Sequence, residues 1–276
     1  MPERLSVIVP TYNEAANIEP LVRQLLAASD EREILVVDDS SPDGTADIVR
    51  RAFGDDPRVK LIVRTTDRGL ANSIRTGLEA SSGELLLVMD SDFNHDPAII
   101  GTMRALLEHF DLVVGSRFVA GGGMEDTFRY YCSLVFNGVV RGFLGTRIQD
   151  NLSGFFAIRR SAFDQLVHDP IFFGYGDYFF RLLKQAADLR LRMVEIPVFY
   201  GLRTAGESKT KYFQVLYTYS KALVALVSSD GLKHRRLERS QLVVGDQARS
   251  TLAANQTDQQ QRAVEQDERH QPVGRR

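Results

Sequence analysis

Two aspartates separated by one serine, Asp90 and Asp92, directly follow a run of leucine, valine and methionine. Residues two apart at the end of a β-strand point to the same side, so both carboxylates can reach one hard cation that prefers oxygen ligands. Mg²⁺ or Mn²⁺ held in this way would bridge two phosphates of a bound donor. The alternative is a solvated turn, because Asp-x-Asp is also frequent in loops.

Similar polar segments follow other apolar runs, namely Pro-Thr-Tyr-Asn-Glu at 10–14, Asp-Asp-Ser-Ser-Pro-Asp-Gly-Thr at 38–45 and Gly-Ser-Arg at 115–117. In an open parallel sheet, ligands bind at the carboxyl ends of the strands. We therefore expect carboxylates from three neighbouring strand ends to converge on one edge of the sheet. Like charges stay ionised together there only if a cation or hydrogen-bond donors offset them.

Positive counter-charge for phosphates has to come from side chains, because the sequence contains neither a Gly-x-Gly-x-x-Gly loop nor a Walker lysine loop. This disfavours a dinucleotide oxidoreductase and a phosphate-loop nucleotidase. The candidate cations are Arg117, Arg129, Arg203, Lys209 and Lys211, each equally compatible with a solvated surface position. His95 is a further candidate metal ligand, although such a histidine more often caps a turn or packs.

The elements that must position these residues follow from the hydrophobic pattern. Runs rich in Val, Ile and Leu alternate with segments of helical period, which predicts an α/β fold with a mostly parallel, Rossmann-like sheet and helices on both faces. The predicted strands are 5–10, 33–38, 59–64, 84–90, 111–117 and 192–200. The predicted helices are 18–26, 70–78, 100–110, 128–144, 176–187 and 212–227. The glycine run 121–123 predicts a flexible loop.

Charge balance and cysteine content limit the partners and the compartment. With 34 basic and 36 acidic residues the net charge is −2, so we expect no nucleic-acid partner. Cys132 alone cannot form an internal disulfide, which favours a reducing compartment. The first residues lack a signal-peptide pattern, and the apolar run 222–227 is far shorter than the roughly 20 residues of a membrane-spanning helix. We therefore predict a cytoplasmic protein.

Composition also predicts how the chain is divided. Residues 1–227 carry the strand and helix pattern and are expected to form one domain. A basic segment follows at 228–239. Residues 240–276 contain eight glutamines and no aromatic residue, so they cannot bury enough apolar area to offset the entropy of ordering. They are predicted to form a disordered tail.

Three motifs in this order and spacing resemble a known family. They are Val-Ile-Val-Pro-Thr-Tyr-Asn-Glu at 7–14, Val-Val-Asp-Asp-Ser-Ser-Pro-Asp-Gly-Thr at 36–45 and Met-Asp-Ser-Asp-Phe-Asn-His-Asp-Pro at 89–97. The sequence is similar in these motifs to the family 2 inverting glycosyltransferases of GT-A fold. The segments 115–118, 150–155 and 203–209 resemble the branch that mannosylates dolichol phosphate or polyprenol phosphate. The resemblance covers about residues 4 to 215.

The resemblance implies roles for individual residues. Donor nucleotide binding falls to Pro10, Tyr12, Glu14, Asp39 and Asp90. Asp90, Asp92 and Asn94 are implied to bind the metal. Many relatives carry Gln at the position of Asn94. The implied catalytic residues are Asp92, Arg117, Arg203 and Lys209. Acceptor or phosphate contacts are implied for Arg129, Ser153, Arg203, Ser208 and Lys209.

The reaction implied is transfer of a hexose, by branch mannose from GDP-mannose, onto a polyprenyl or dolichyl phosphate with Mg²⁺ or Mn²⁺ as cofactor. A lipid phosphate is already anionic near neutral pH, so no strong general base is required. The alternative is transfer from a UDP-sugar to a saccharide or lipid hydroxyl, which needs a base such as Asp150 or Asp177. A non-catalytic nucleotide-sugar-binding module is a further alternative of a different class.

Members of this branch act mostly at membranes. The helix predicted at 212–227 and the basic residues that follow it could dock on an anionic lipid surface, each cation contributing about 1 kcal/mol. These basic residues are Lys233, His234, Arg235, Arg236 and Arg239. The alternative is a helix packed on the domain, followed by a solvated basic run. Peripheral membrane contact is therefore one of two expectations.

Overall fold

The computed structural model describes residues 3–28, 32–201, 217–226 and 228. The chain divides into two units, Met1–Leu223 and Val224–Arg276. The sheets and numbered helices described below all belong to the first unit.

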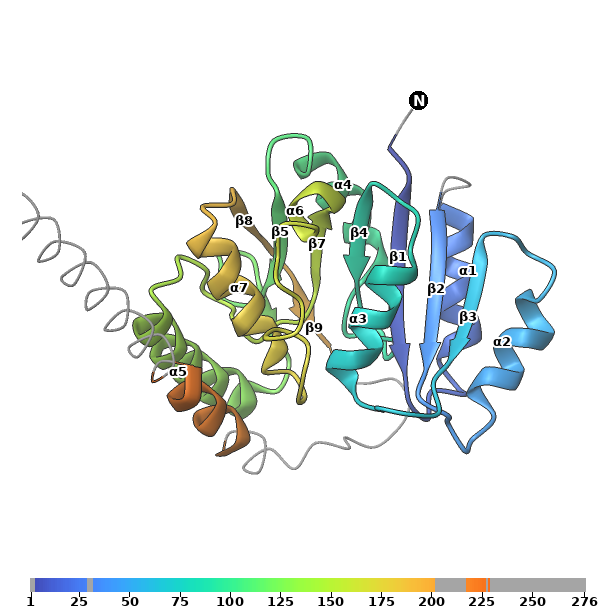
Figure 1. The fold of residues 1–276 in the computed structure, drawn as a ribbon, viewed down its shortest axis with the longest axis horizontal. Helices are drawn as coiled ribbons and strands as arrows, with labels where there is room; N and C mark the ends of the chain where they lie inside the picture. Colours follow the sequence, from blue (N-terminus) through green and yellow to red (C-terminus); the bar gives the residue numbers. More distant parts are fainter. Residues whose placement is uncertain (1–2, 29–31, 202–216, 227, 229–276) are drawn as a thin grey trace, which may run out of the picture. The chain divides into compact units, whose positions relative to one another are not determined.

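The first unit is built on a seven-stranded sheet with the order β3-β2-β1-β4-β7-β5-β8 (Figure 1). The strands are β1 (Leu5–Thr11), β2 (Arg32–Asp38), β3 (Val59–Val63), β4 (Leu85–Val88), β5 (Leu112–Ser116), β7 (Phe156–Arg159) and β8 (Met193–Pro197). All pairs are parallel except those of β7, which runs antiparallel to both β4 and β5. Central strands such as β1 and β2 are buried over their whole length, which explains their continuous apolar runs.

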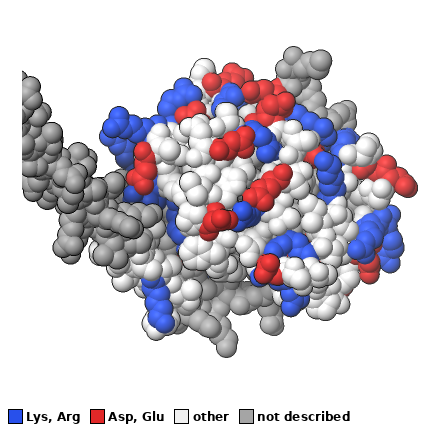
Figure 2. Space-filling model, viewed as in Figure 1, with Lys and Arg blue, Asp and Glu red and all other residues white. Residues whose placement is uncertain are grey.

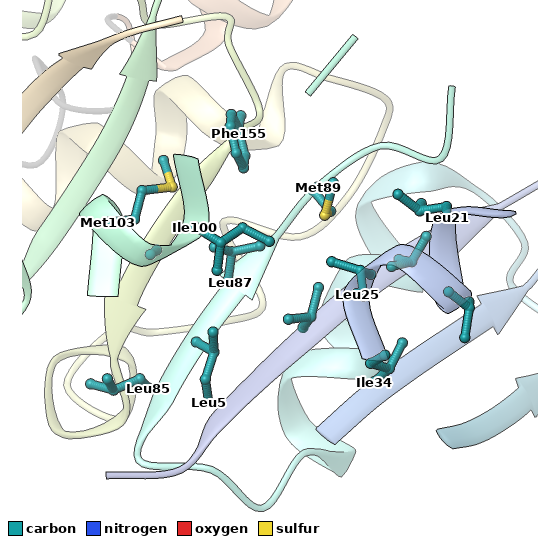
Figure 3. Close-up of a cluster of buried hydrophobic side chains, with 14 of the residues drawn as sticks. Leu5, Leu21, Leu25, Ile34, Leu85, Leu87, Met89, Ile100, Met103 and Phe155 are labelled. Carbon is teal, nitrogen blue, oxygen red and sulfur yellow. The ribbon is translucent and has the colours of Figure 1, made fainter. Parts of the chain in front are cut away.

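Helices cover both faces of this sheet, as the sequence predicts. On one face, α1 (Ile18–Ala28), α2 (Thr45–Phe53) and α4 (Ile100–Leu106) pack onto one core cluster, with the short 3₁₀ helix η1 (Pro97–Ile99) leading into α4. On the other face, α3 (Leu70–Ala80), α6 (Arg160–Phe163) and α7 (Tyr178–Asp188) pack onto a second cluster. Figure 3 shows the first cluster, where Ile100 of α4 lies beside Leu87 of β4 and Leu25 of α1 lies near Ile34 of β2.

Two predictions about the second half are wrong. The strand predicted at 192–200 is divided between β8 and a short strand, β9 (Phe199–Tyr200), which belongs to another sheet. The glycine run is not a free loop, because β6 (Gly123–Met124) pairs with β9 and the Gly123 N–H donates to the Val198 carbonyl at 3.0 Å. Backbone hydrogen bonds thus hold a segment whose composition alone indicates flexibility.

Helix α5 (Thr127–Leu144) is the longest of the numbered helices and follows the predicted bounds closely. Asp126 caps its amino end by accepting from the Arg129 N–H, and Gly145, with φ of 65°, ends it. Its buried residues are Asn137, Val140 and Leu144. Large apolar side chains are exposed along the rest of its length, including Phe128, Tyr131, Val135, Val139 and Phe143. Within the described residues, no helix combines the length and the apolar character that crossing a bilayer requires.

Candidate active site

The carboxyl ends of β2, β1 and β4 are neighbours in the sheet, so the polar segments that follow them converge as predicted. Thr11 Oγ1 donates to Asp38 Oδ1 at 3.1 Å, and Ser41 Oγ donates to the same oxygen at 2.5 Å. The Asn13 N–H in turn donates to Ser41 Oγ at 2.9 Å. Side chains after β2 therefore fix the loop that follows β1.

Backbone strain is concentrated at this edge. Five non-glycine residues in the described chain have a positive φ, and Asn13, Ser40, Asp67 and Phe93 lie just after β1, β2, β3 and β4. Such a conformation costs on the order of 1 to 3 kcal/mol and persists where surrounding contacts enforce it, often at functional sites. Phe93, with φ of 62°, lies between Asp92 and Asn94 in the acidic motif.

The residues predicted to bind the nucleotide-sugar donor differ in their solvent exposure. Pro10 is buried within β1, the Tyr12 side chain is exposed, and Glu14 is half-buried and accepts from Asn17 Nδ2 at 2.9 Å. Asp39 is buried, and its Oδ1 accepts from Arg64 Nη1 and from Ser73 Oγ, each at 2.8 Å.

The carboxylate of Asp39 is held on its other oxygen as well, because Oδ2 accepts from the Gly69 N–H at 2.6 Å. The negative charge of Asp39 is therefore paired with Arg64 and fixed in orientation. Sequence reasoning did not identify Arg64 as a site residue. Its position directly after β3 is the signal that could identify it, because the carboxyl ends of parallel strands line one edge of the sheet.

Asp90 and Asp92 lie directly after β4, as predicted, but their surroundings differ. The Asp90 side chain is half exposed, whereas Asp92 is buried. Asn94 donates to both oxygens of Asp92, through its backbone N–H at 3.2 Å and its Nδ2 at 2.9 Å. In this geometry Asn94 orients the Asp92 carboxylate.

His95 is fully buried beside this turn. The Asp90 N–H donates to His95 Nδ1 at 2.8 Å, and His95 Nε2 lies 2.8 Å from the Tyr200 hydroxyl oxygen. Burial, which penalises the imidazolium, lowers the pKa of His95 to about 4, so the ring is neutral near pH 7. Because Nδ1 is the acceptor, the hydrogen-bond network assigns the proton to Nε2, which donates to Tyr200.

Arg117 and Asp150 form a buried, two-pronged ion pair. Arg117 Nε and Nη2 donate to the two oxygens of Asp150, each at 2.8 Å, and the Arg117 N–H donates to Asp150 Oδ2 at 3.1 Å. The guanidinium also lies over the Tyr200 ring, 4.9 Å from its centroid. Glu195 of β8 accepts from the Asp150 N–H at 3.0 Å and so fixes the loop that carries the aspartate.

The antiparallel strand β7 brings its amino end to the same edge, and Ser153 comes with it. Ser153 Oγ donates to the Gly115 carbonyl at 2.5 Å, and the Tyr200 hydroxyl donates to the Ser153 carbonyl at 3.1 Å. Ser153 thus joins β5, β7 and Tyr200 in the described structure.

Other predicted residues lie apart from this network or outside the described residues. Arg129, at the start of α5, forms an ion pair with Asp126 at 3.3 Å. Asp177 pairs with Arg181 at 2.5 Å and is buried. The predictions for Arg203, Ser208, Lys209, Lys211 and the segment 229–276 lie outside the described residues, whereas 217–226 of the last predicted helix are helical.

The donor set can be compared with what a divalent ion requires. Among the described residues, no group of three or more His, Cys, Asp or Glu side chains is arranged to hold a metal. Mg²⁺, however, is usually bound by one or two carboxylates together with substrate phosphates and water. Asp90 and Asp92 supply two hard oxygen donors and therefore fit an ion shared with a diphosphate.

Comparison with known proteins adds evidence that is independent of this geometry. The family model described as "Glycosyl transferase family 2" matches residues 6–167. A dolichol-phosphate mannosyltransferase from Pyrococcus furiosus is 34% identical over 236 residues, which cover 83% of this chain and 65% of that protein. An undecaprenyl-phosphate mannosyltransferase from Micrococcus luteus is 36% identical over 216 residues, covering 75% and 87%.

Solved structures show a similar fold. Glucosyl-3-phosphoglycerate synthase from Mycobacterium tuberculosis, in complex with Mn²⁺, UDP and glucosyl-3-phosphoglycerate, superposes with a TM-score of 0.63. The two chains are 20% identical, and the match covers 81% of this chain and 79% of the other. The same synthase in complex with Mg²⁺ and UDP gives a TM-score of 0.61 at 21% identity. At these identities the likeness establishes the fold alone.

Proposed function

The chain belongs to glycosyl transferase family 2 and has the GT-A fold that its motifs predict, and from this premise we propose that it transfers mannose from GDP-mannose to a polyprenyl phosphate. The named activities of the relatives from Pyrococcus and Micrococcus support the sugar and the class of acceptor. The observation that carries the proposal is the pair Asp90 and Asp92 at the edge where β2, β1 and β4 end.

The proposed donor site extends along this edge. Tyr12, whose ring is exposed, and Glu14 contact the base and ribose, with Pro10 shaping the backbone beneath them. Asp39 contacts the nucleoside with a carboxylate that Arg64 and the Gly69 N–H hold in place. A preorganised group of this kind loses little entropy when the donor binds.

Asp90 and Asp92 would hold the diphosphate end of the donor through Mg²⁺ or Mn²⁺. A divalent ion bound there would offset the negative charge that develops on the departing nucleoside diphosphate. Asn94 keeps Asp92 oriented, and the Arg117–Asp150 pair keeps a guanidinium fixed close to the same edge. Removing one well-placed donor of this kind costs roughly 3 kcal/mol of transition-state stabilisation in other enzymes.

The burial and ion pairing of two carboxylates favour a phosphate acceptor over a hydroxyl acceptor. A hydroxyl needs a general base, and the candidates for that role are Asp150 and Asp177. Both are buried and paired with an arginine, Arg117 and Arg181 respectively. A phosphate oxygen is already anionic and needs no such base. Arg129, Arg203, Ser208 and Lys209 remain predicted contacts of this phosphate, and Ser153 holds the backbone beside it.

Contact with the membrane that carries the acceptor is part of the proposal. The exposed apolar residues of α5 lie in a helix whose charged residues, Arg129 and Arg141, are both basic. An apolar face flanked by cations suits the boundary between anionic headgroups and acyl chains. The protein would act as a peripheral protein on the cytoplasmic face of a membrane.

The test is a transfer assay with purified protein, Mn²⁺, a short-chain polyprenyl phosphate and a panel of nucleotide sugars. Release of GDP that depends on both GDP-mannose and the lipid is the expected result. The Asp92→Ala variant and excess chelator should each abolish it. GDP binding without lipid-dependent release would indicate a binding module, and transfer to a hydroxyl from a UDP-sugar would support the alternative acceptor.

A further inference from the structure

A chain of buried polar contacts joins the acidic turn to the rest of the site, and its central members are His95 and Tyr200. We propose that these two are positioning residues, which hold the Asp90–Asp92 turn in the geometry that binds a metal–diphosphate unit. This inference rests on the proposed function, because it concerns the same metal site.

The first step concerns the backbone where β4 ends. The Met89 N–H donates to the Ile8 carbonyl at 3.1 Å, in continuation of the pairing between β4 and β1. At the next residue the sheet no longer supplies the acceptor, and the Asp90 N–H donates to His95 Nδ1 instead. The imidazole therefore closes a turn that contains both aspartates and the strained Phe93.

The second step concerns what fixes the imidazole itself. Its ring is stacked on Phe155, with centroids 4.4 Å apart and planes within 8° of each other. Its Nε2–H donates to the Tyr200 hydroxyl, which in turn donates a hydrogen bond to the Ser153 carbonyl. This arrangement keeps the proton on Nε2 and leaves Nδ1 as the acceptor for Asp90.

Tyr200 also connects the two charged parts of the site. It is buried in β9, far along the chain from the acidic turn, and the Arg117 guanidinium lies over its ring. The Tyr200 side chain thus contacts both His95, which holds the acidic turn, and the cationic Arg117. An apolar replacement for His95 could fill the space, but it would leave the Asp90 N–H without this acceptor.

The test uses two variants of similar size that separate the two ring nitrogens. His95→Asn places an amide oxygen near the former Nδ1 and can still accept from Asp90, whereas His95→Gln places its amide near the former Nε2. The measured quantity is Mn²⁺ affinity of the full-length protein in the presence of GDP, read from the electron paramagnetic resonance signal of free Mn²⁺. Sugar transfer is not needed for this measurement.

We expect His95→Asn to bind Mn²⁺ within about threefold of the wild type and His95→Gln to bind it about tenfold more weakly, since only His95→Gln removes the acceptor at the former Nδ1 position. His168 provides the matched control. It is also stacked on a phenylalanine, Phe163, with ring centroids 4.3 Å apart, but its ring nitrogens contact Glu79 of α3 and the Phe163 carbonyl of α6. His168→Asn and His168→Gln should leave Mn²⁺ affinity unchanged. Equal affinities for His95→Asn and His95→Gln would overturn the inference.

A second measurement locates the imidazole proton in the wild type and in the variant Tyr200→Phe. A long-range ¹H–¹⁵N spectrum of the histidine side chains should show His95 as the Nε2–H tautomer, and Tyr200→Phe should add a population with the proton on Nδ1. A wild-type spectrum with the proton on Nδ1 would overturn the inference. If the wild type binds Mn²⁺ with GDP but transfers no mannose, the proposed reaction fails while the positioning role stands. Absence of Mn²⁺ binding by the wild type overturns both.

Discussion

At the scale of single residues, the strongest constraint is the buried ion pair of Arg117 and Asp150. The Asp150 side chain is fully buried and that of Arg117 is 8% exposed, so each charge is compensated by the other and not by water. A buried pair adds little net stability against apolar residues of the same shape, but removing one partner leaves an uncompensated charge. The pair therefore fixes the orientation of the Arg117 guanidinium, which suits the phosphate counter-charge that we propose it to be.

The variant Asp150→Asn should destabilise the protein by about 3 to 5 kcal/mol and strongly reduce transfer, because it leaves the Arg117 charge buried without a carboxylate. Asp111→Asn is the matched control, since Asp111 makes a similar two-pronged contact with Arg192, whose side chain is 63% exposed. That change should cost no more than about 1 kcal/mol. Urea unfolding measures both, and equal losses would contradict the importance given to burial.

At the scale of elements, helix α5 combines exposure with apolar character. The double variant Val135→Ser with Phe143→Ser should leave the thermal midpoint nearly unchanged, because both side chains are exposed. Its binding to anionic lipid vesicles should fall by about tenfold or more, since burial of each such side chain contributes about 1.5 to 3 kcal/mol. Co-sedimentation with vesicles measures this.

The control for α5 is a pair of exposed apolar residues away from that helix, Val167→Ser with Leu189→Ser. This variant should sediment with vesicles as the wild type does. Transfer to a short, soluble polyprenyl phosphate should be unaffected in both double variants. If both lose vesicle binding to the same degree, α5 has no special role at the membrane.

Strand β2 begins with a buried carboxylate at the edge opposite the site. Burial alone would raise the pKa of Glu33, but hydrogen bonds from Lys60, Ser6 and Ser82 outweigh it and lower the pKa to about 2. Because the folded-state pKa is depressed, its stabilising contribution is present above pH 4.5 and is lost as pH falls towards 2. We take this contribution as about 2 kcal/mol, because Lys60 is half exposed and partly screened.

Glu33→Gln should therefore reduce the free energy of unfolding at pH 7, and its difference from the wild type should shrink as pH falls below 4.5. Urea unfolding at several pH values measures the difference. Glu79→Gln, which changes an exposed carboxylate of α3, is the control and should cost within about 0.5 kcal/mol at every pH. A Glu33→Gln penalty that does not vary with pH would contradict the assigned cause.

The sequence predicted elements well where burial is uniform. β1 and β2 are buried at every position, so their apolar runs mark them directly. It missed β7, because Phe-Ala-Ile-Arg at Phe156–Arg159 is short and its direction depends on the two strands that receive it. The division of the last strand into β8 and β9 depends on pairing with β6, which no local pattern encodes.

The candidate site was predictable to the same extent. Asp90 and Asp92 could be identified because residues at the carboxyl ends of parallel strands share one edge. Arg64 obeys the same rule and was overlooked. The link between His95 and Tyr200 spans 105 positions in the sequence, so only the folded structure brings it into view.

At the scale of the whole molecule, the net charge is too small to steer charged ligands towards the site. Figure 2 shows acidic and basic side chains interspersed over the face that it presents, in keeping with the net charge of −2. Recognition of an anionic donor must then depend on the local arrangement at the sheet edge. A ligand that binds there stabilises the folded protein by mass action.

We expect Mn²⁺ alone to raise the thermal midpoint little, because the protein contributes two carboxylates and a diphosphate must complete the coordination. Mn²⁺ with GDP at about 100 times Kd should add about 2.7 kcal/mol, or about 5 to 10 °C. Differential scanning fluorimetry measures this, and a chelator should reverse the added increment. A full shift with GDP in the presence of chelator would contradict a shared metal site.

The antiparallel strand β7 has a consequence for how the chain reaches its fold. In the described part of the chain β4 and β5 are not paired with each other, and Phe156–Arg159, added between them later in the sequence, joins the two parts of the sheet. During synthesis, both strands therefore present open hydrogen-bonding edges until this segment leaves the ribosome. Such edges invite pairing with other chains, so we expect nascent chains that end before residue 156 to aggregate and to need chaperones.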